Sequence, residues 1–134
     1  MKQVAKLVLI DSDNKYLLMY RSEHPTFGND PDLPGGTLEE GETLLETMLR
    51  EVQEESGVVV AASDAHLVYS GTEYSTHGTH YALFIAQLSS HPDVVMSWEH
   101  SSYEWLSLAD FLVKIEGAND TYMRMVYDTL KRRT

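Results

Sequence analysis

Residues 36–58, GTLEEGETLLETMLREVQEESGV, combine an acidic and an apolar pattern that both have the period of an α-helix. Glu51, Glu54 and Glu55 stand at positions i, i+3 and i+4, so a helix holds them on one face. The neighbouring face is apolar and carries Leu45, Met48, Leu49 and Val52. Ionised carboxylates held together repel one another unless a cation lies among them, and Mg²⁺ prefers oxygen ligands. The pattern therefore predicts a helix that packs on a core and presents a face able to bind a cation.

The ends of this helix are also marked in the sequence. Thr43 and Glu46 have the spacing of a capping box at the start, and Gly57 suits the end. A solvated acidic surface is the ordinary explanation for a glutamate-rich helix. The fixed positions around the three glutamates favour a metal site over that explanation.

The spacing within residues 36–58 resembles the Nudix box at every specified position. It runs Gly36, five residues, Glu42, seven residues and then REVQEESGV at residues 50–58. Such a match arises by chance on the order of once in 10⁹ start sites. The order of predicted elements along the whole chain is also similar to that of Nudix hydrolases. The resemblance implies an α+β fold, the Nudix-type α/β/α sandwich with a mixed β-sheet between helices, in a single domain over residues 1–134.

The resemblance implies a chemistry and a set of metal ligands. Nudix hydrolases cleave a nucleoside diphosphate linked to another group, by attack of metal-activated water on phosphorus, with Mg²⁺ or Mn²⁺ as cofactor. Glu51, Glu54 and Glu55 match the metal-binding glutamates of the family. The carbonyl of Gly36 matches a further, backbone ligand. Among these residues, Glu51 and Glu54 are also expected to be catalytic.

Further roles follow from the same resemblance. Arg50 and Glu42 match residues that brace the loop and the helix, so Arg50 is placed with the catalytic residues. Many family members recruit another glutamate from a segment after the box, for which Glu99 is the better candidate and Glu104 the second. Glu99 is then an expected metal ligand. Glu51 and Glu99 are the two candidates for the general base.

The substrate-binding residues are expected outside the box. Side chains that could stack a base or hold a phosphate are Arg21, His24, Phe27, Tyr74 and Tyr81. The leading expectation is a mutator-type (MutT-like) enzyme that hydrolyses a nucleoside triphosphate. A dinucleoside polyphosphate, weakly indicated by Tyr74, and an ADP-sugar are the alternatives. The proline that ADP-ribose pyrophosphatases tend to have about fifteen residues beyond the box is absent.

Two other activities fit the same scaffold less well. A nucleotide-binding sensor domain without turnover often lacks box glutamates, whereas this chain keeps them all. An isoprenoid diphosphate isomerase uses a cysteine, and the chain has none. Hydrolysis is therefore preferred over binding alone and over isomerisation.

Composition limits the partners and the cofactor. The formal net charge is −11, which argues against a broad basic surface for nucleic acid. The box supplies seven glutamates and one arginine, so six of the eleven net negative charges lie there. Without cysteine, a metal must be held by oxygen or imidazole ligands. The expected partner is a small-molecule nucleotide substrate, and a homodimer is compatible with the sequence.

The apolar run near the N-terminus is too short for a signal peptide or a membrane span, so a cytoplasmic protein without membrane contact is expected. The remaining periodicity predicts a β-rich domain with two hairpins and two later helices. The proline-rich and glycine-rich residues 22–34 are expected to form a substrate-facing loop, and residues 34–36 a sharp turn. The predicted strands are 2–10, 15–21, 32–33, 58–61, 65–74, 79–88 and 103–106. The predicted later helices are 108–115 and a final one capped by Asn119 or Asp120.

Overall fold

The computed structural model of the chain describes residues 1–22 and 30–134. Its strands are β1 (Gln3–Ile10), β2 (Tyr16–Arg21), β3 (Pro31–Asp32), β4 (Gly35–Thr37), β5 (Ala65–Gly71), β6 (His80–Gln87) and β7 (His100–Leu106). Its helices are α1 (Leu44–Ser56), the short 3₁₀ turn η1 (Ala62–Asp64), α2 (Leu108–Glu116) and α3 (Thr121–Arg133). Within the described ranges, no helix has both the length and the apolar character needed to cross a membrane.

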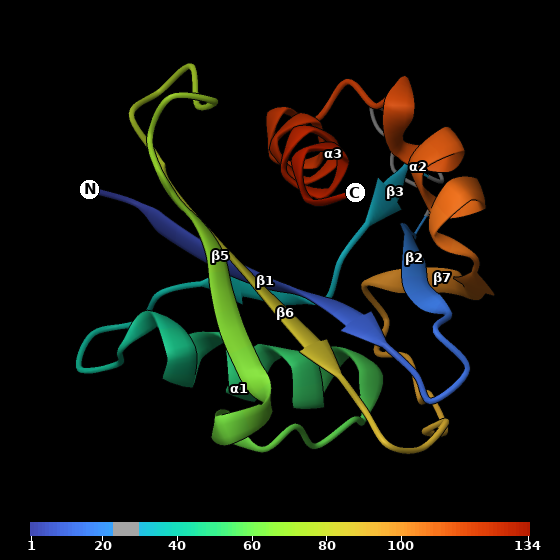
Figure 1. Cartoon of the computed structure of the whole chain (residues 1–134). Coiled ribbons are helices and arrows are strands. Elements are labelled where there is room, and N and C mark those ends of the chain that lie inside the picture. The colour runs from blue at the N-terminus through green and yellow to red at the C-terminus, as the bar shows by residue number, and fades with distance from the viewer. Residues whose placement is uncertain (23–29) are drawn as a thin grey trace.

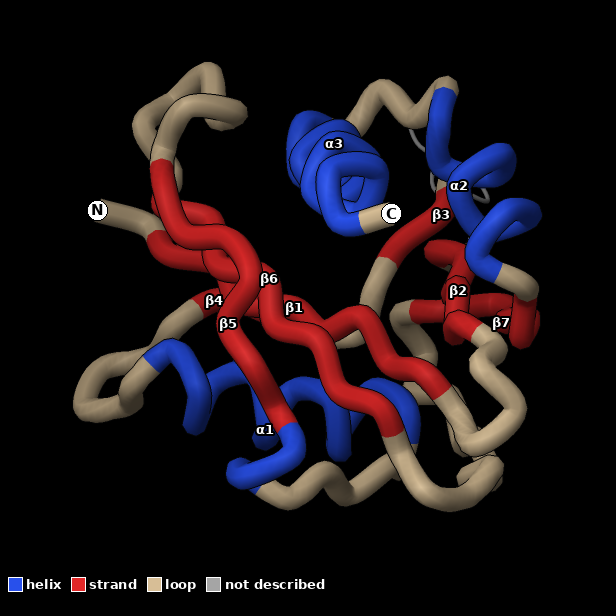
Figure 2. The backbone as a smooth tube through the Cα atoms, viewed as in Figure 1, coloured by secondary structure: helices blue, strands red, loops and turns tan. Residues whose placement is uncertain are grey.

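The sheet is mixed and divides into two groups of strands. β1 runs parallel to β6 from the pair Gln3 and His80 to the pair Ile10 and Gln87, and β5 continues antiparallel beyond β6. On its other edge β1 pairs with β4 and then, at Ile10 and Tyr16, with β2. β2 pairs in turn with β3 and β7. Figure 2 shows the resulting groups, β4-β1-β6-β5 and β3-β2-β7.

Helices cover both faces of the sheet (Figure 1). α1 lies against one face, and α2 and α3 lie against the other. Strand alternation explains this, because successive side chains point to opposite faces. Leu7 and Leu9 of β1 join the core under α1, whereas Val8 and Ile10 join the core under α3. The fold is therefore the expected α/β/α sandwich with a mixed sheet between helices.

The expected ends of α1 are confirmed. The Thr43 hydroxyl accepts a hydrogen bond from the Glu46 amide at 3.1 Å, and the Glu46 carboxylate accepts one from the Thr43 amide at 2.8 Å. Gly57 ends the helix with φ of 73°, a left-handed conformation that costs glycine little. Met48 and Val52 are fully buried beneath the sheet. These local signals and the apolar stripe fix the helix in the predicted position.

Two predictions about the segments that flank α1 are wrong. Residues 58–61 form no strand: Val58 and Val60 are buried in alternation, but the segment pairs with no strand among the described residues. Residues 35–37 are strand β4 on the edge of β1, where a sharp turn was expected. Gly35 has φ of 149°, and a Cβ there would lie 2.4 Å from the Ala5 carbonyl oxygen, so this contact with β1 requires glycine.

Candidate active site

Arg50 ties the loop before α1 to the acidic face of the helix. Its Nε and Nη2 atoms donate to the two oxygens of Glu42, at 2.7 and 3.0 Å. Its Nη1 atom donates to Glu51 at 2.9 Å and lies 3.3 Å from Glu54. The hydrogen bonds from Arg50 lower the pKa of Glu42 to about 2. The guanidinium thus holds three glutamates of the box in one cluster.

Glu51 lies against the backbone of Gly36. A Cβ at Gly36 would be 2.5 Å from the carboxyl carbon of Glu51, so only glycine leaves room for this side chain. Burial raises the pKa of Glu51 although the hydrogen bond from Arg50 opposes the shift. Glu54, by contrast, has 57% of its side chain exposed. Strand β4 and helix α1 therefore bring the backbone of Gly36 and the Glu51 carboxylate together.

Glu55 is the most enclosed of the box glutamates, with 4% of its surface exposed. Its Oε2 atom accepts a hydrogen bond from the Gly35 amide at 2.8 Å. Its Oε1 atom lies 4.0 Å from Nδ1 of His100. Burial raises the pKa of Glu55 to about 8, although the Gly35 hydrogen bond acts in the opposite direction.

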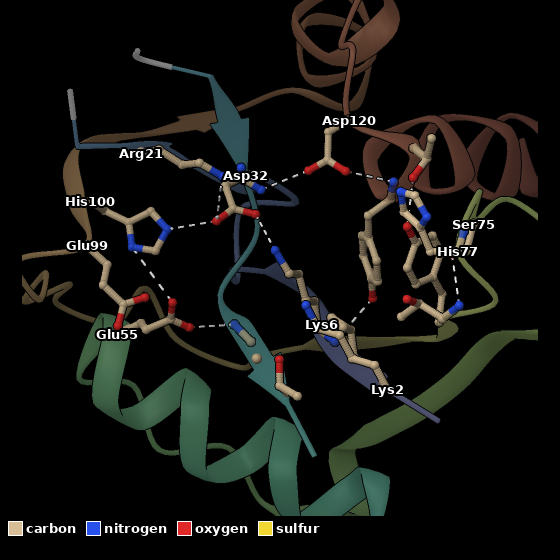
Figure 3. Close-up of a pocket in the computed structure, with 18 of the residues that line it drawn as sticks. Lys2, Lys6, Arg21, Asp32, Glu55, Ser75, His77, Glu99, His100 and Asp120 are labelled. Carbon is tan, nitrogen blue, oxygen red and sulfur yellow. Dashed lines mark hydrogen bonds and ion pairs between the residues drawn. The ribbon is translucent and has the colours of Figure 1, made fainter. Parts of the chain in front are cut away.

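A cleft of about 720 Å³ opens between the box and the N-terminal end of α3. Figure 3 shows Glu55 and Glu99 on one side of it and Asp120 on another. The sequence-predicted residues that line the cleft are Arg21, Gly36, Glu55, Tyr81 and Glu99. Its volume lies in the range typical of pockets for small-molecule ligands.

The floor of the cleft holds a charged network that the sequence reasoning missed. Asp32 is buried, and its carboxylate accepts from Lys6 Nζ at 2.5 Å and contacts His100 Nε2 at 3.0 Å. Arg21 lies 3.6 Å from Asp32 and 2.8 Å from Asp120. Burial alone raises the pKa of Asp32, but Lys6, His100 and Arg21 outweigh it and lower that pKa well below the usual range. The available signal was a lysine inside the apolar strand 2–10.

The remaining predicted residues lie in different surroundings. Glu99 stands in the exposed loop before β7, whereas Glu104 accepts from the Tyr20 hydroxyl and lies 3.8 Å from Lys114. The Tyr81 hydroxyl forms a 2.7 Å hydrogen bond with Thr121 at the start of α3.

Tyr74 contacts α3, where its hydroxyl donates to Asp128 at 2.6 Å. Phe27 and His24 lie outside the described residues.

The donor set fits a hard divalent cation. Glu51 lies beside the backbone of Gly36, Glu55 and Glu99 line the cleft, and Glu54 is exposed on the same helix face as Glu51. Carboxylate oxygens of this kind suit Mg²⁺ or Mn²⁺. Among the residues described, no three acidic or histidine side chains already converge on one point. Arg50 holds Glu51 and Glu54, while the Gly35 amide holds Glu55.

Comparison with known proteins gives one family. The NUDIX domain model matches residues 1–126. The ADP-ribose pyrophosphatase of Methanocaldococcus jannaschii is 39% identical over 70 residues, which are 52% of this chain and 41% of that protein. The match thus spans less than half of the length of this relative.

Solved structures agree with the family match. The MutT protein from Methanosarcina mazei Go1 is 25% identical, with a TM-score of 0.72, over 98% of this chain and 93% of that chain. The NUDIX domain of Shewanella oneidensis NrtR, solved in complex with ADP ribose, is 25% identical, with a TM-score of 0.73, over 98% and 86% of the two chains. A C. elegans Ap4A hydrolase shares the fold, with a TM-score of 0.74 at 20% identity over 96% and 93% of the two chains. The match to the family model, together with the box carried on β4 and α1, shows that the chain belongs to the Nudix family.

Proposed function

We propose that the chain is a pyrophosphohydrolase that cleaves the diphosphate linkage of a nucleoside diphosphate derivative, with Mg²⁺ or Mn²⁺ as cofactor. The observation that carries this proposal is the meeting of Gly36, Glu55 and Glu99 on one cleft. The box and the later glutamate are separated by more than forty residues in sequence, and the fold brings both to the same cavity. Family membership supports the same chemistry.

The metal would be held by Glu51, Glu54, Glu55 and Glu99 and by the backbone of Gly36. When bound, a divalent cation neutralises phosphate charge and activates a water molecule for attack on phosphorus. Arg50 orients Glu51 and Glu54 through the hydrogen bonds described above.

We assign the role of general base to Glu99 or Glu51. Glu99 is exposed at the cleft, where it can reach a water molecule. Glu51 is already half-buried beside Gly36. Substitution of each glutamate in turn, with pH profiles of kcat, separates the two assignments.

Two substrate classes are the main candidates. The sequence favours a nucleoside triphosphate, and the likeness to a MutT protein agrees with that preference. The relative named as an ADP-ribose pyrophosphatase, and the NrtR domain in complex with ADP ribose, support an ADP-sugar as the second candidate. Arg21 and Tyr81 are proposed to hold the substrate in either case, since both line the cleft. Tyr74 and Phe27 remain predicted substrate residues.

A substrate panel tests the proposal. The protein is incubated with nucleoside triphosphates, ADP-ribose and dinucleoside polyphosphates, each with Mg²⁺ or Mn²⁺, and the products are separated by chromatography. Release of pyrophosphate from a triphosphate, or of AMP from ADP-ribose, identifies both the activity and the substrate. Tight nucleotide binding without any cleavage would instead favour the sensor domain. Light scattering of the same sample tests whether the protein forms the homodimer that the sequence allows.

A further inference from the structure

His100 is a buried histidine between two carboxylates from different elements. It begins β7, and 1% of its side chain is exposed. Its Nε2 atom faces Asp32 of β3, and its Nδ1 atom faces Glu55 of α1 (Figure 3). Within residues 1–22 and 30–134, Nδ1 has no hydrogen-bond partner although it is buried. Buried polar atoms almost always have a partner, so this atom calls for an explanation.

Asp32 fixes one edge of the imidazole ring. The distance from Nε2 to the Asp32 carboxylate is 3.0 Å, and Lys6 holds the other oxygen of that carboxylate at 2.5 Å. Asp32 is an ionised acceptor, because its pKa is lowered by Lys6, His100 and Arg21 in spite of burial. Nε2 therefore donates to Asp32, and this hydrogen bond orients the imidazole ring.

The other edge of the ring faces the free oxygen of Glu55. Oε2 of Glu55 is already bound by the Gly35 amide at 2.8 Å, which leaves Oε1 for a second contact. Oε1 lies 4.0 Å from Nδ1, which is beyond hydrogen-bond distance. The terminal torsion of a glutamate is broad, so a modest rotation can close this gap. Hydrogen bonds of this kind are often long in unliganded sites and shorten when the ligand is bound.

We propose that His100 is a positioning residue for Glu55: with both ring nitrogens protonated, Nε2 donates to Asp32 and Nδ1 donates to Oε1 of Glu55 when Glu55 binds the divalent cation. This role rests on the proposed function, because it takes Glu55 as a metal ligand. It also connects the ligand to the cleft floor, since His100 bonds Asp32, which in turn contacts Lys6 and Arg21. Partners that orient metal ligands are usually worth about 10- to 100-fold in metal affinity.

Two amide substitutions separate this role from a purely structural one. The side-chain amide of asparagine reaches as far as Nδ1 and can donate or accept there, but it does not reach Asp32. The amide of glutamine reaches as far as Nε2, so it keeps the contact with Asp32 and leaves the Glu55 side empty. If His100 positions Glu55, His100→Asn should keep the metal affinity and His100→Gln should lose it. If His100 only supports the fold through Asp32, His100→Gln should be the milder change.

The readout is the affinity of the substrate-free protein for Mn²⁺, measured by titration calorimetry. We expect His100→Asn to bind Mn²⁺ within about threefold of the parent, and His100→Gln to bind it at least about tenfold more weakly. Retained affinity in His100→Gln, whether or not His100→Asn also retains it, would overturn the proposal. His91→Asn is the matched control, because His91 pairs with Asp11 through Nδ1 at 2.7 Å outside the cleft.

A measurement on the unmodified protein decides the case in which both His100 variants bind weakly or fail to fold. The ring nitrogens of histidine are observed by ¹⁵N NMR during a Mg²⁺ titration. A shift of the His100 Nδ1 signal, with the His91 signals unchanged, supports the role, and an unmoved His100 signal refutes it. Failure of the proposed function has a different signature: the parent protein binds Mn²⁺ but cleaves no substrate of the panel. A Glu55→Gln variant that binds Mn²⁺ as the parent does would remove Glu55 from the ligand set, and His100 with it.

Discussion

Arg50 and Glu42 form two parallel hydrogen bonds across the first turns of α1, from Nε and Nη2 to the two carboxylate oxygens at 2.7 and 3.0 Å. Such two-point contacts fix the guanidinium plane, because its donors match the spacing of carboxylate oxygens. Once that plane is fixed, Nη1 points toward Glu51 and Glu54. Glu42 therefore sets the position of two expected metal ligands through Arg50.

The first prediction concerns Arg50→Lys. Lysine keeps the positive charge but cannot make the two-point contact with Glu42, so Glu51 and Glu54 lose their fixed orientation. We expect kcat/KM to fall about 10- to 100-fold, with little change in the circular dichroism spectrum. Arg124→Lys on the exposed side of α3 is the control and is expected to match the parent. A rate for Arg50→Lys equal to that of the control would contradict the bracing role.

The second prediction concerns Glu54→Gln. Its side chain is 57% exposed on α1, so its loss is not expected to disturb the core. Removal of an expected metal ligand should lower kcat at least about 100-fold and weaken Mn²⁺ binding. Steady-state kinetics with calorimetry measures both effects, and Glu40→Gln in the exposed loop before α1 is the control. A Glu54→Gln enzyme as fast as the parent would remove Glu54 from the site.

The third prediction separates two adjacent glycines by the atoms that an added methyl group would meet. In Gly35→Ala the new Cβ lies 2.4 Å from the Ala5 carbonyl oxygen, and φ is 149°, so we expect a large loss of stability. In Gly36→Ala the Cβ meets the Glu51 carboxyl carbon at 2.5 Å, and a side chain can move away more easily than backbone. We therefore expect Gly36→Ala to remain folded but to lose activity. Thermal unfolding and kinetics of both variants distinguish these outcomes, and equal melting temperatures would contradict the prediction.

The fourth prediction concerns Asp32 and pH. Since its pKa is lower in the folded protein than the usual 3.8, Asp32 stabilises the fold above that pH, and the stabilisation is lost as the pH falls. Asp32→Asn leaves Lys6 buried without its counter-charge and should lower the free energy of unfolding by about 3 to 5 kcal/mol near pH 7. Urea unfolding between about pH 2 and 7 should also show a weaker acid dependence in this variant. Asp93→Asn, at an exposed position, is expected to behave as the parent.

Most of the fold could be predicted because its signals are local. The ends of α1 depend on Thr43, Glu46 and Gly57, which lie within the helix or next to it. The predicted hairpin of residues 65–74 and 79–88 is present as β5 and β6. The strand prediction for residues 58–61 was wrong because Val58 and Val60 are buried in alternation, as in a strand. Sequence periodicity carries no information on whether a partner strand is present.

The cleft floor could not be predicted because its contacts are distant in sequence. Lys6 and Asp32 are 26 residues apart, and Asp32 and His100 are 68 residues apart. Each of these residues, taken alone, reads as an ordinary strand or loop position. Glu99 could be proposed only because the family pattern places a glutamate after the box. Asp120 was expected as a helix cap, which it is, but its ion pair with Arg21 had no sequence signal.

In the described part of the chain, β1 and β2 meet at a single register pair, Ile10 and Tyr16, and then diverge. Away from this pair, Lys6 of β1 reaches Asp32 of β3, so an ion pair links the group β4-β1-β6-β5 to the group β3-β2-β7. The ion pair of the cleft floor therefore also holds the two halves of the sheet together. An engineer who alters Lys6 or Asp32 to change substrate choice will change the cohesion of the domain in the same step. A variant with altered selectivity at either residue should therefore also show a changed thermal stability.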